Sequence, residues 1–297
     1  MSRISDFVRT EFKNGDDLRD AGLTTPEDIV RYDDIIYGGD SQWQALDVYC
    51  PKGTESRAFP VIVSVHGGGW VYGDKERYQF YCMNLAQRGF AVVNFTYRLA
   101  PENKFPAPLE DTNLVFKWIP RHTQQYSFDS KHIFAVGDSA GAHILALYSC
   151  ICTNPGYAAE YSFYPPKDFA PTAVALNCGV YTVSLDLGPD GHLDLTQQLM
   201  ADYLPDKGSE KELELINAAK HITPLFPPTF LMTSNGDFLK GQAPVLEAAL
   251  AEKEIPHVSR FYGDKDHTLG HVFHCNVKSA DAKLCNDEEC AFFKEFL

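Results

Sequence analysis

Basic residues are scarce in this 297-residue sequence, which contains 26 Lys and Arg against 40 Asp and Glu. The resulting formal net charge of −14 argues against a nucleic-acid-binding protein, because such a protein needs a basic surface to meet the phosphates. The same charge disfavours attachment to anionic membrane surfaces. We therefore expect neither nucleic acid nor a membrane among the partners of the chain.

Long apolar runs and paired cysteines are also missing. No uninterrupted apolar stretch is long enough to cross a bilayer. Charged residues interrupt the N-terminal MSRISDFVRTEFKNGDDLRD, which is therefore unlike a signal peptide. The eight cysteines are scattered and form no Cys-x-x-Cys pair. We expect a cytoplasmic protein with reduced thiols and no bound metal.

Apolar strands alternate with helical segments along most of the chain. Continuous apolar strands in this alternation are typical of an α/β fold, with a parallel sheet covered by helices on both faces. An antiparallel strand pair at 34–38 and 44–50 precedes them, and we predict a single α/β domain over residues 1–297. The predicted buried strands are 60–66, 91–97, 132–137, 172–180, 229–234 and 257–262, with helices at 139–152 and 242–253 among those between them.

Two segments fall outside this alternation. Residues 1–28 carry apolar residues at helical spacing and a helix-start signal in TTPEDI, which together predict two short amphipathic helices. Residues 183–222 are long for a crossover and rich in polar turns. We expect both segments to form a small helical cap at the C-terminal edge of the sheet, where α/β proteins bind ligands. The alternative for 183–222 is a lengthened helical crossover.

A nucleophile is predicted where the strand at 132–137 ends. The sequence Gly137-Asp138-Ser139-Ala140-Gly141 lies directly between that strand and an amphipathic helix. G-x-S-x-G in this strand–turn–helix setting is typical of a nucleophile elbow, in which a strained backbone projects the serine hydroxyl above the sheet. The alternative is a serine that only caps the helix. We interpret Ser139 as the nucleophile.

A serine nucleophile needs a base and an acid that orients the base. In this type of fold the chain order is Ser, then Asp or Glu, then His. Asp237 follows the strand at 229–234 and is the predicted acid. Candidate bases after the last strand are His267, His271 and His274. These histidines with Cys275 also suggest a metal, but Gly270 interrupts their spacing, and we expect none.

Three consecutive glycines follow the first buried strand in VIVSVHGGGWVYGDK, residues 61–75. Glycine adds no side chain to pack and loses much conformational freedom on folding, so three together are costly unless they are needed. A loop of this kind leaves its backbone N–H groups bare. It could present them to a ligand or to a negative charge that forms only during a reaction.

The chain resembles the hormone-sensitive-lipase-like, HGGG-motif serine esterases of the α/β-hydrolase superfamily. HGGGW (66–70) is similar to the family's HGGG loop, and GDSAG (137–141) to its elbow. YRLAPENKFPAPLED (97–111) is close to the family's YRLAPE-x-x-FPA-x-LED segment, and PPTFLMTSNGDFL (227–239) resembles its acid loop. The resemblance covers roughly residues 60 to 275. It implies an α/β-hydrolase fold with a mostly parallel central sheet.

The resemblance also assigns residues to roles. It implies Ser139, Asp237 and a C-terminal histidine as catalytic residues, and HVF (271–273) is similar to the family's His-Gly-Phe, which favours His271. His267, five residues after Tyr262 rather than nine, has the spacing more common in the family. The backbone N–H groups of an oxyanion hole are then those of Gly68, Gly69 and Ala140. Trp70 and Tyr72 could line a substrate pocket.

We accordingly expect a serine carboxylesterase that hydrolyses short- to medium-chain acyl esters, acetyl esters among them, through an acyl-enzyme on Ser139. Its partner is then a small-molecule ester, and this chemistry needs no cofactor. The alternatives are a peptidase or amidase with the same triad, and a non-catalytic small-molecule-binding module. An exposed edge strand could pair two subunits into a homodimer.

Overall fold

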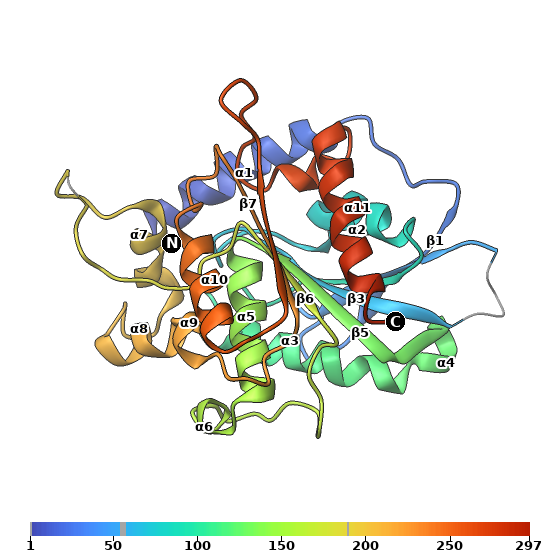
Figure 1. The fold of residues 1–297 in the computed structure, drawn as a ribbon, viewed down its shortest axis with the longest axis horizontal. Helices are drawn as coiled ribbons and strands as arrows, with labels where there is room; N and C mark the ends of the chain where they lie inside the picture. The colour runs from blue at the N-terminus through green and yellow to red at the C-terminus, as the bar shows by residue number, and fades with distance from the viewer. Residues whose placement is uncertain (1, 54–57, 189) are drawn as a thin grey trace.

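One mixed sheet forms the centre of the molecule (Figure 1). The computed structural model describes residues 2–53, 58–188 and 190–297. The strand order is β1-β2-β4-β3-β5-β6-β7-β8, in which β2 is antiparallel to β1 and β4 while the other neighbours are parallel. The strands are β1 (Ile29–Ile36), β2 (Ala45–Pro51), β3 (Phe59–Val65), β4 (Ala91–Phe95), β5 (Phe128–Asp138), β6 (Val174–Asn177), β7 (Thr229–Ser234) and β8 (His257–Tyr262).

Helices cover both faces of this sheet, so the predicted α/β-hydrolase fold is confirmed. Side chains of α2 and α11 pack with strand residues in one buried cluster, and those of α3, α5 and α10 pack in another. The helices are α1 (Arg3–Asp20), α2 (Lys75–Ala86), α3 (Ala107–Trp118), α4 (Thr123–Tyr126), α5 (Ala140–Thr153), α6 (Pro155–Ala158), α7 (Leu195–Tyr203), α8 (Glu210–Ile216), α9 (Ala218–His221), α10 (Gln242–Glu252) and α11 (Ala280–Lys294), with 3-10 turns at Ile119–Arg121 and Phe273–Cys275.

The candidate site lies in the loops at the ends of the central strands, because these strands are buried on both faces. Every residue of β3, FPVIVSV, is buried, since β4 and β5 flank it and helices cover both sides. Such a strand must end in a loop before its backbone can reach solvent. The glycines 67–69 begin that loop, and the neighbouring β5 ends at Asp138, directly before Ser139.

The first 28 residues differ from the expectation of two helices. One helix, α1, covers Arg3–Asp20, and its first turn is capped by the Ser2 side chain, which accepts from the Ile4 amide. TTPEDI forms a turn instead, in which the Ile29 amide donates to the Pro26 carbonyl. The helix-start signal fails here because Ile29 already begins β1 and leaves no residues for a second helical turn.

α1 lies along the upper edge of the molecule in Figure 1, close to α7. Arg9 fixes its middle by donating to the carbonyl oxygens of Val71 and Ala100, at 2.8 and 2.9 Å. The Ser5 hydroxyl donates to Asp202 and joins α1 to α7. These contacts attach the first helix of the chain to the loop that carries the three glycines.

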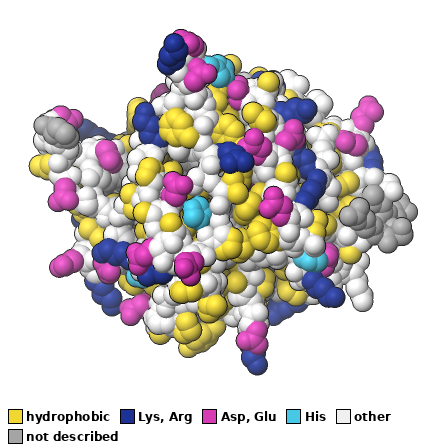
Figure 2. Space-filling model, in the orientation of Figure 1, with side chains coloured by type: hydrophobic (Ala, Val, Ile, Leu, Met, Phe, Trp, Pro, Cys, Tyr) yellow, Lys and Arg dark blue, Asp and Glu magenta, His cyan; other side chains and the backbone are white. Residues whose placement is uncertain are grey.

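The face of the molecule in Figure 2 carries scattered acidic and basic side chains, with hydrophobic side chains between them. The exposed apolar residues include Phe7 and Leu18 of α1 and Phe238 beside the site described below. Among the helices of the described residues, none has the length and apolar character required to cross a bilayer.

Candidate active site

Ser139 occupies the turn between β5 and α5 with φ 51° and ψ −118°. This region is rarely adopted by residues other than glycine, and such strain is retained where the surrounding structure enforces it. The Ser139 amide donates to the Asn177 carbonyl of β6 at 2.9 Å. A Cβ at Gly141 would lie 2.0 Å from the Val65 carbonyl oxygen, so only glycine allows α5 to approach β3 this closely. The predicted strained turn is therefore present.

The structure brings Ser139, His271 and Asp237 together. His271 Nε2 lies 3.0 Å from Ser139 Oγ, and His271 Nδ1 lies 2.7 Å from Asp237 Oδ1. Both distances suit hydrogen bonds, so Asp237 orients the imidazole whose other nitrogen faces the serine hydroxyl. The three side chains come from the ends of β5 and β7 and from the loop after β8.

Asp237 is 1% exposed, yet its surroundings favour the ionised carboxylate. Burial alone raises the pKa of a carboxyl group, but the hydrogen bond and positive charge of His271 act against burial, as do donors from the Leu239 amide and the Thr233 hydroxyl. The net effect is a pKa below the ordinary value. An ionised Asp237 can stabilise an imidazolium on His271.

The two other candidate histidines lie elsewhere. His267 is exposed and contacts Asp281 of α11 at 3.0 Å. His274 is fully buried, and its Nε2 lies 3.6 Å from the Cys275 sulfur. Burial lowers the pKa of His274 to about 3, so this imidazole is neutral. Of the three histidines, His271 alone is hydrogen-bonded to Ser139 in the structure.

The glycine loop presents unpaired amides beside Ser139. Gly68 and Gly69 have φ values of +117° and +61°, and a Cβ at Gly68 would lie 2.0 Å from the Tyr72 carbonyl oxygen. Among the described residues, the N–H groups of Gly68, Gly69 and Ala140 have no acceptor. Gly68 itself accepts from the amides of Val71 and Tyr72, which fixes the loop. Such amides can bind a developing oxyanion.

A second link fixes this loop, and sequence reasoning missed it. The Tyr78 hydroxyl of α2 accepts from the Gly67 amide at 2.9 Å and donates to Asp138 Oδ2 at 2.7 Å. Asp138 itself is 2% exposed. Burial raises its pKa to about 6. Tyr78 lies 60 residues away, and no local pattern in the sequence connects the two residues.

Two cavities meet at Ser139. One, of about 230 Å³, is lined by Tyr72 and His271 with residues of α1. The other, of about 20 Å³, is lined by Trp70 together with residues of α7. The two aromatic residues predicted to line a pocket therefore lie on different cavities. The Trp70 indole donates to His143 Nδ1 at 3.1 Å and is almost completely buried.

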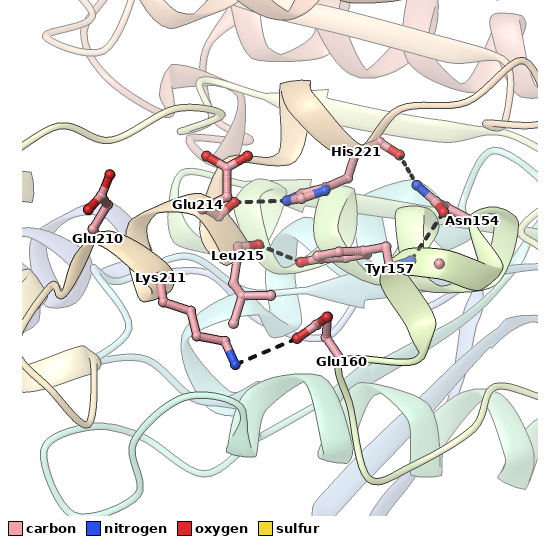
Figure 3. Close-up of a pocket in the computed structure, with 9 residues that line it drawn as sticks. Asn154, Tyr157, Glu160, Glu210, Lys211, Glu214, Leu215 and His221 are labelled. Carbon is pink, nitrogen blue, oxygen red and sulfur yellow. Dashed lines mark hydrogen bonds and ion pairs between the residues drawn. The ribbon is translucent and has the colours of Figure 1, made fainter.

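Figure 3 shows a larger cavity, of about 740 Å³, between α6, α8 and α9. Its polar groups contact one another: the Tyr157 hydroxyl donates to the Leu215 carbonyl, His221 Nε2 contacts the Glu214 carbonyl, and Lys211 pairs with Glu160. Its lining residues include no serine or cysteine. We therefore place the chemistry at Ser139 rather than in the cavity of Figure 3.

Two groups of side chains have metal-ligand character among the described residues. Cys178, Asp237 and His271 form one, and Asp138, His274 and Cys275 form the other. Both nitrogens of His271 already contact Asp237 and Ser139. Burial raises the pKa of both thiols well above the ordinary value, which disfavours the thiolate that a metal requires. The absence of a metal stays a prediction.

This sheet with a strained serine between strand and helix defines an α/β-hydrolase. The family model named BD-FAE matches residues 46–243, more than half of the chain, and the chain belongs to this family of α/β-hydrolase esterases. The predicted resemblance to the α/β-hydrolase esterases is confirmed.

Among curated relatives, esterase LipC of Mycobacterium tuberculosis is 31% identical over 42% of this chain and 31% of its own length. Versiconal hemiacetal acetate esterase of Dothistroma septosporum is 27% identical over 77% of this chain and 72% of its own. The chain thus spans less than a third of LipC. The crystal structure of esterase B of Lactobacillus rhamnosus superposes with a TM-score of 0.87 at 24% identity, covering 99% and 95% of the two chains, and supports the fold.

Proposed function

We propose that the chain is a serine carboxylesterase that hydrolyses short- to medium-chain acyl esters, including acetyl esters. One observation carries this proposal: Ser139 Oγ, His271 and Asp237 are hydrogen-bonded in series at the meeting point of two cavities. The names of the curated relatives, which are esterases, support the same reaction class. A small-molecule ester is the substrate that cavities of this size accept.

The proposed reaction begins with His271 Nε2 taking the proton of Ser139 as Oγ attacks the ester carbonyl. The carbonyl oxygen becomes an anion that accepts from the amides of Gly68, Gly69 and Ala140. His271 then donates its proton to the leaving alcohol, and the acyl group remains on Ser139. Water, deprotonated by His271, attacks the acyl-enzyme, and His271 returns this proton to Ser139 Oγ as the bond to the acyl group breaks and the acid leaves. Removing one such amide donor typically raises the barrier by about 2.7–4 kcal/mol.

We further propose that α1 and residues 183–222 act as a cap on one hydrolase domain. Glu11, Phe12 and Asp16 of α1 line the larger cavity with Ser139. Leu195 and Leu199 of α7 line the smaller one. The cap would thereby supply cavity walls, while the strands and their loops supply the reacting groups.

The test is Ser139→Ala against Ser149→Ala. Ser149 lies in the same helix, α5, and its buried hydroxyl has no partner among the described residues, so it is a matched control. We expect Ser139→Ala to lower kcat for p-nitrophenyl acetate and butyrate at least ~10³-fold, and Ser149→Ala to retain activity. Mass spectrometry should show one covalent alkylphosphonate adduct on the wild type and on Ser149→Ala, and none on Ser139→Ala.

Full esterase activity in Ser139→Ala would contradict the mechanism. Turnover of amides but not esters by the wild type would instead establish the amidase alternative. Folded wild-type protein that neither hydrolyses esters nor takes the phosphonate, yet binds small ligands, would establish the non-catalytic one.

A further inference from the structure

The position of His271 decides which cavity receives which half of an ester. In the tetrahedral intermediate, the leaving oxygen must accept a proton from His271 Nε2, so the alcohol lies on the His271 side of Ser139. The acyl group lies on the opposite side. The larger cavity is lined by both Ser139 and His271, whereas the smaller one is lined by Ser139 without His271. The larger cavity is therefore on the alcohol side.

The walls of the smaller cavity are held firmly. Trp70 stacks on Tyr203 with 4.9 Å between ring centroids, and its indole is hydrogen-bonded to His143. Leu199 is 2% exposed, and a Cβ on Gly69 would lie 2.9 Å from Leu199 Cδ1. A cavity of about 20 Å³ accommodates roughly one water-sized group. An acetyl methyl fits this space, and each further methylene must displace a lining side chain, Leu199 and Trp70 being the most firmly held.

The larger cavity suits a ring. At about 230 Å³ it exceeds the roughly 150 Å³ that encloses a benzene molecule. Phe12, Tyr72 and Tyr78 line it, and the first two lie edge to face, 6.1 Å between centroids. These aromatic side chains offer both faces and edges to a flat, apolar group.

The charge at the same cavity is negative. Arg19 lines the cavity, but its guanidinium is hydrogen-bonded to Asp16 and Asp20 at 2.8 Å. Glu11 also lines the cavity, and its carboxylate forms no ion pair among the described residues. An anionic alcohol would therefore meet a carboxylate and find no cation free to pair with it.

We propose, on the basis of the proposed esterase function, that the substrates are acetyl esters of ring-sized, apolar alcohols that are neutral or positively charged. Leu199 and Trp70 set the acyl length, and Glu11 sets the charge preference for the alcohol. The asymmetry of the two cavities and the side on which His271 lies carry this assignment.

The acyl half is tested with phenyl acetate, propionate, butyrate and hexanoate, which share one leaving group. For the wild type, we expect kcat/KM to fall at least ~10-fold from acetate to butyrate, because a methylene that does not fit costs 10- to 200-fold. Leu199→Ala should move the maximum to butyrate or longer. Leu215→Ala removes the same atoms from a cap helix beside the cavity of Figure 3 and should leave the profile unchanged.

Leu195→Ala, at a half-buried position on the same cavity, is the second variant if Leu199→Ala does not fold. A wild-type maximum at hexanoate, or an unchanged profile in every folded variant, would overturn the acyl assignment. If Leu199→Ala changed the preference among methyl, phenyl and naphthyl acetates instead, the two halves would be reversed. In each of these cases Ser139-dependent hydrolysis persists, whereas failure of the proposed function removes hydrolysis of every ester.

The charge half is tested by comparing phenyl acetate with 4-carboxyphenyl acetate. We expect kcat/KM of the wild type to be at least ~10-fold higher for the neutral ester than for the anionic one at low salt. Glu11→Gln should reduce this ratio several-fold. Glu210→Gln, which neutralises an exposed carboxylate at the cavity of Figure 3, is the control and should leave the ratio unchanged. An equal ratio in wild type and Glu11→Gln would overturn the role of Glu11.

Discussion

At the scale of single residues, Tyr78 connects the two halves of the proposed catalytic site. Its hydroxyl accepts from Gly67, which begins the glycine loop, and donates to Asp138, which precedes Ser139. In the proposed mechanism, Ser139 and the loop amides must keep their relative positions while charge moves onto the substrate oxygen. A hydrogen bond to each side from one buried phenol helps to hold that spacing.

Tyr78→Phe keeps the ring and removes both hydrogen bonds. We expect kcat for p-nitrophenyl acetate to fall about 10-fold or more with little change in KM, because the loop amides bind the transition state more than the substrate. Tyr161→Phe is the control, since it removes a buried hydroxyl that donates to Tyr157, at the cavity of Figure 3. An unchanged kcat in Tyr78→Phe would exclude a positioning role for the hydroxyl.

The sequence predicted the residues of the site unevenly. Ser139 and Asp237 follow strand ends and can be placed by chain order alone. His271 could not be separated from His267 by counting residues, because the loop after β8 first turns outward and then returns through the bridge between Gly236 and Gly270. The two hydrogen bonds of Tyr78 could not be found from the sequence, since their partners, Gly67 and Asp138, are joined to it by no local pattern.

At the scale of elements, two helical glycines show opposite uses of the same residue. Gly141 in α5 faces the backbone of Val65 and His66, and a Cβ there would lie 2.0 and 2.5 Å from their carbonyl oxygens. Gly15 in α1 has no atom within 4 Å of the equivalent position. The first glycine allows close packing of helix on strand, whereas the second, which lines the cavity at Ser139, weakens its helix.

The two Gly→Ala variants should therefore change stability in opposite directions. We expect Gly15→Ala to raise the free energy of unfolding by about 0.4–1 kcal/mol. Gly141→Ala should lower it by more than about 2 kcal/mol, because backbone must move to admit the methyl group. Chemical denaturation of both variants measures the difference. Equal effects of the two substitutions would contradict the packing described for α5.

Elements were predicted well where packing and local pattern agree. The strands at 60–66 and 229–234 match β3 and β7 within a residue, because both are continuous apolar runs in the middle of the sheet. TTPEDI was mispredicted, since a local cap signal does not show that its own last residue, Ile29, already pairs in β1. The order of strands across the sheet depends on contacts between distant segments, which local periodicity does not report.

At the scale of the whole molecule, the C-terminal helix reaches the core behind the nucleophile. Glu289 of α11 is fully buried and accepts from Asn177 Nδ2 at 2.6 Å and from the Tyr81 hydroxyl at 3.1 Å. Burial raises its pKa to about 7, although these two hydrogen bonds act to lower it. The backbone carbonyl of Asn177 also accepts a hydrogen bond from the Ser139 amide. The helix α11, β6 and the turn at Ser139 therefore share one polar network.

This carboxyl should make stability depend on pH. Between its ordinary pKa of 4.5 and about 7, the folded state binds the proton more tightly than the unfolded chain, so stability falls as pH rises. The difference in unfolding free energy, wild type minus Glu289→Gln, should decrease by roughly 3 kcal/mol from pH 4.5 to 8. Buried histidines titrate in both proteins and cancel. A constant difference across this pH range would show that the pKa of Glu289 is not raised in the folded protein.

The helix α1 has a consequence for how new selectivity can arise. It begins at Arg3 and lines the larger cavity, yet it lies outside the BD-FAE match, which starts at residue 46. Ser139, Asp237 and His271 come from later segments. Libraries that randomise the cavity-lining residues of α1 and keep Arg9, which holds the glycine loop, would therefore yield proteins with new alcohol preferences and the same proposed hydrolytic chemistry, so selectivity and catalysis can diverge independently in this fold.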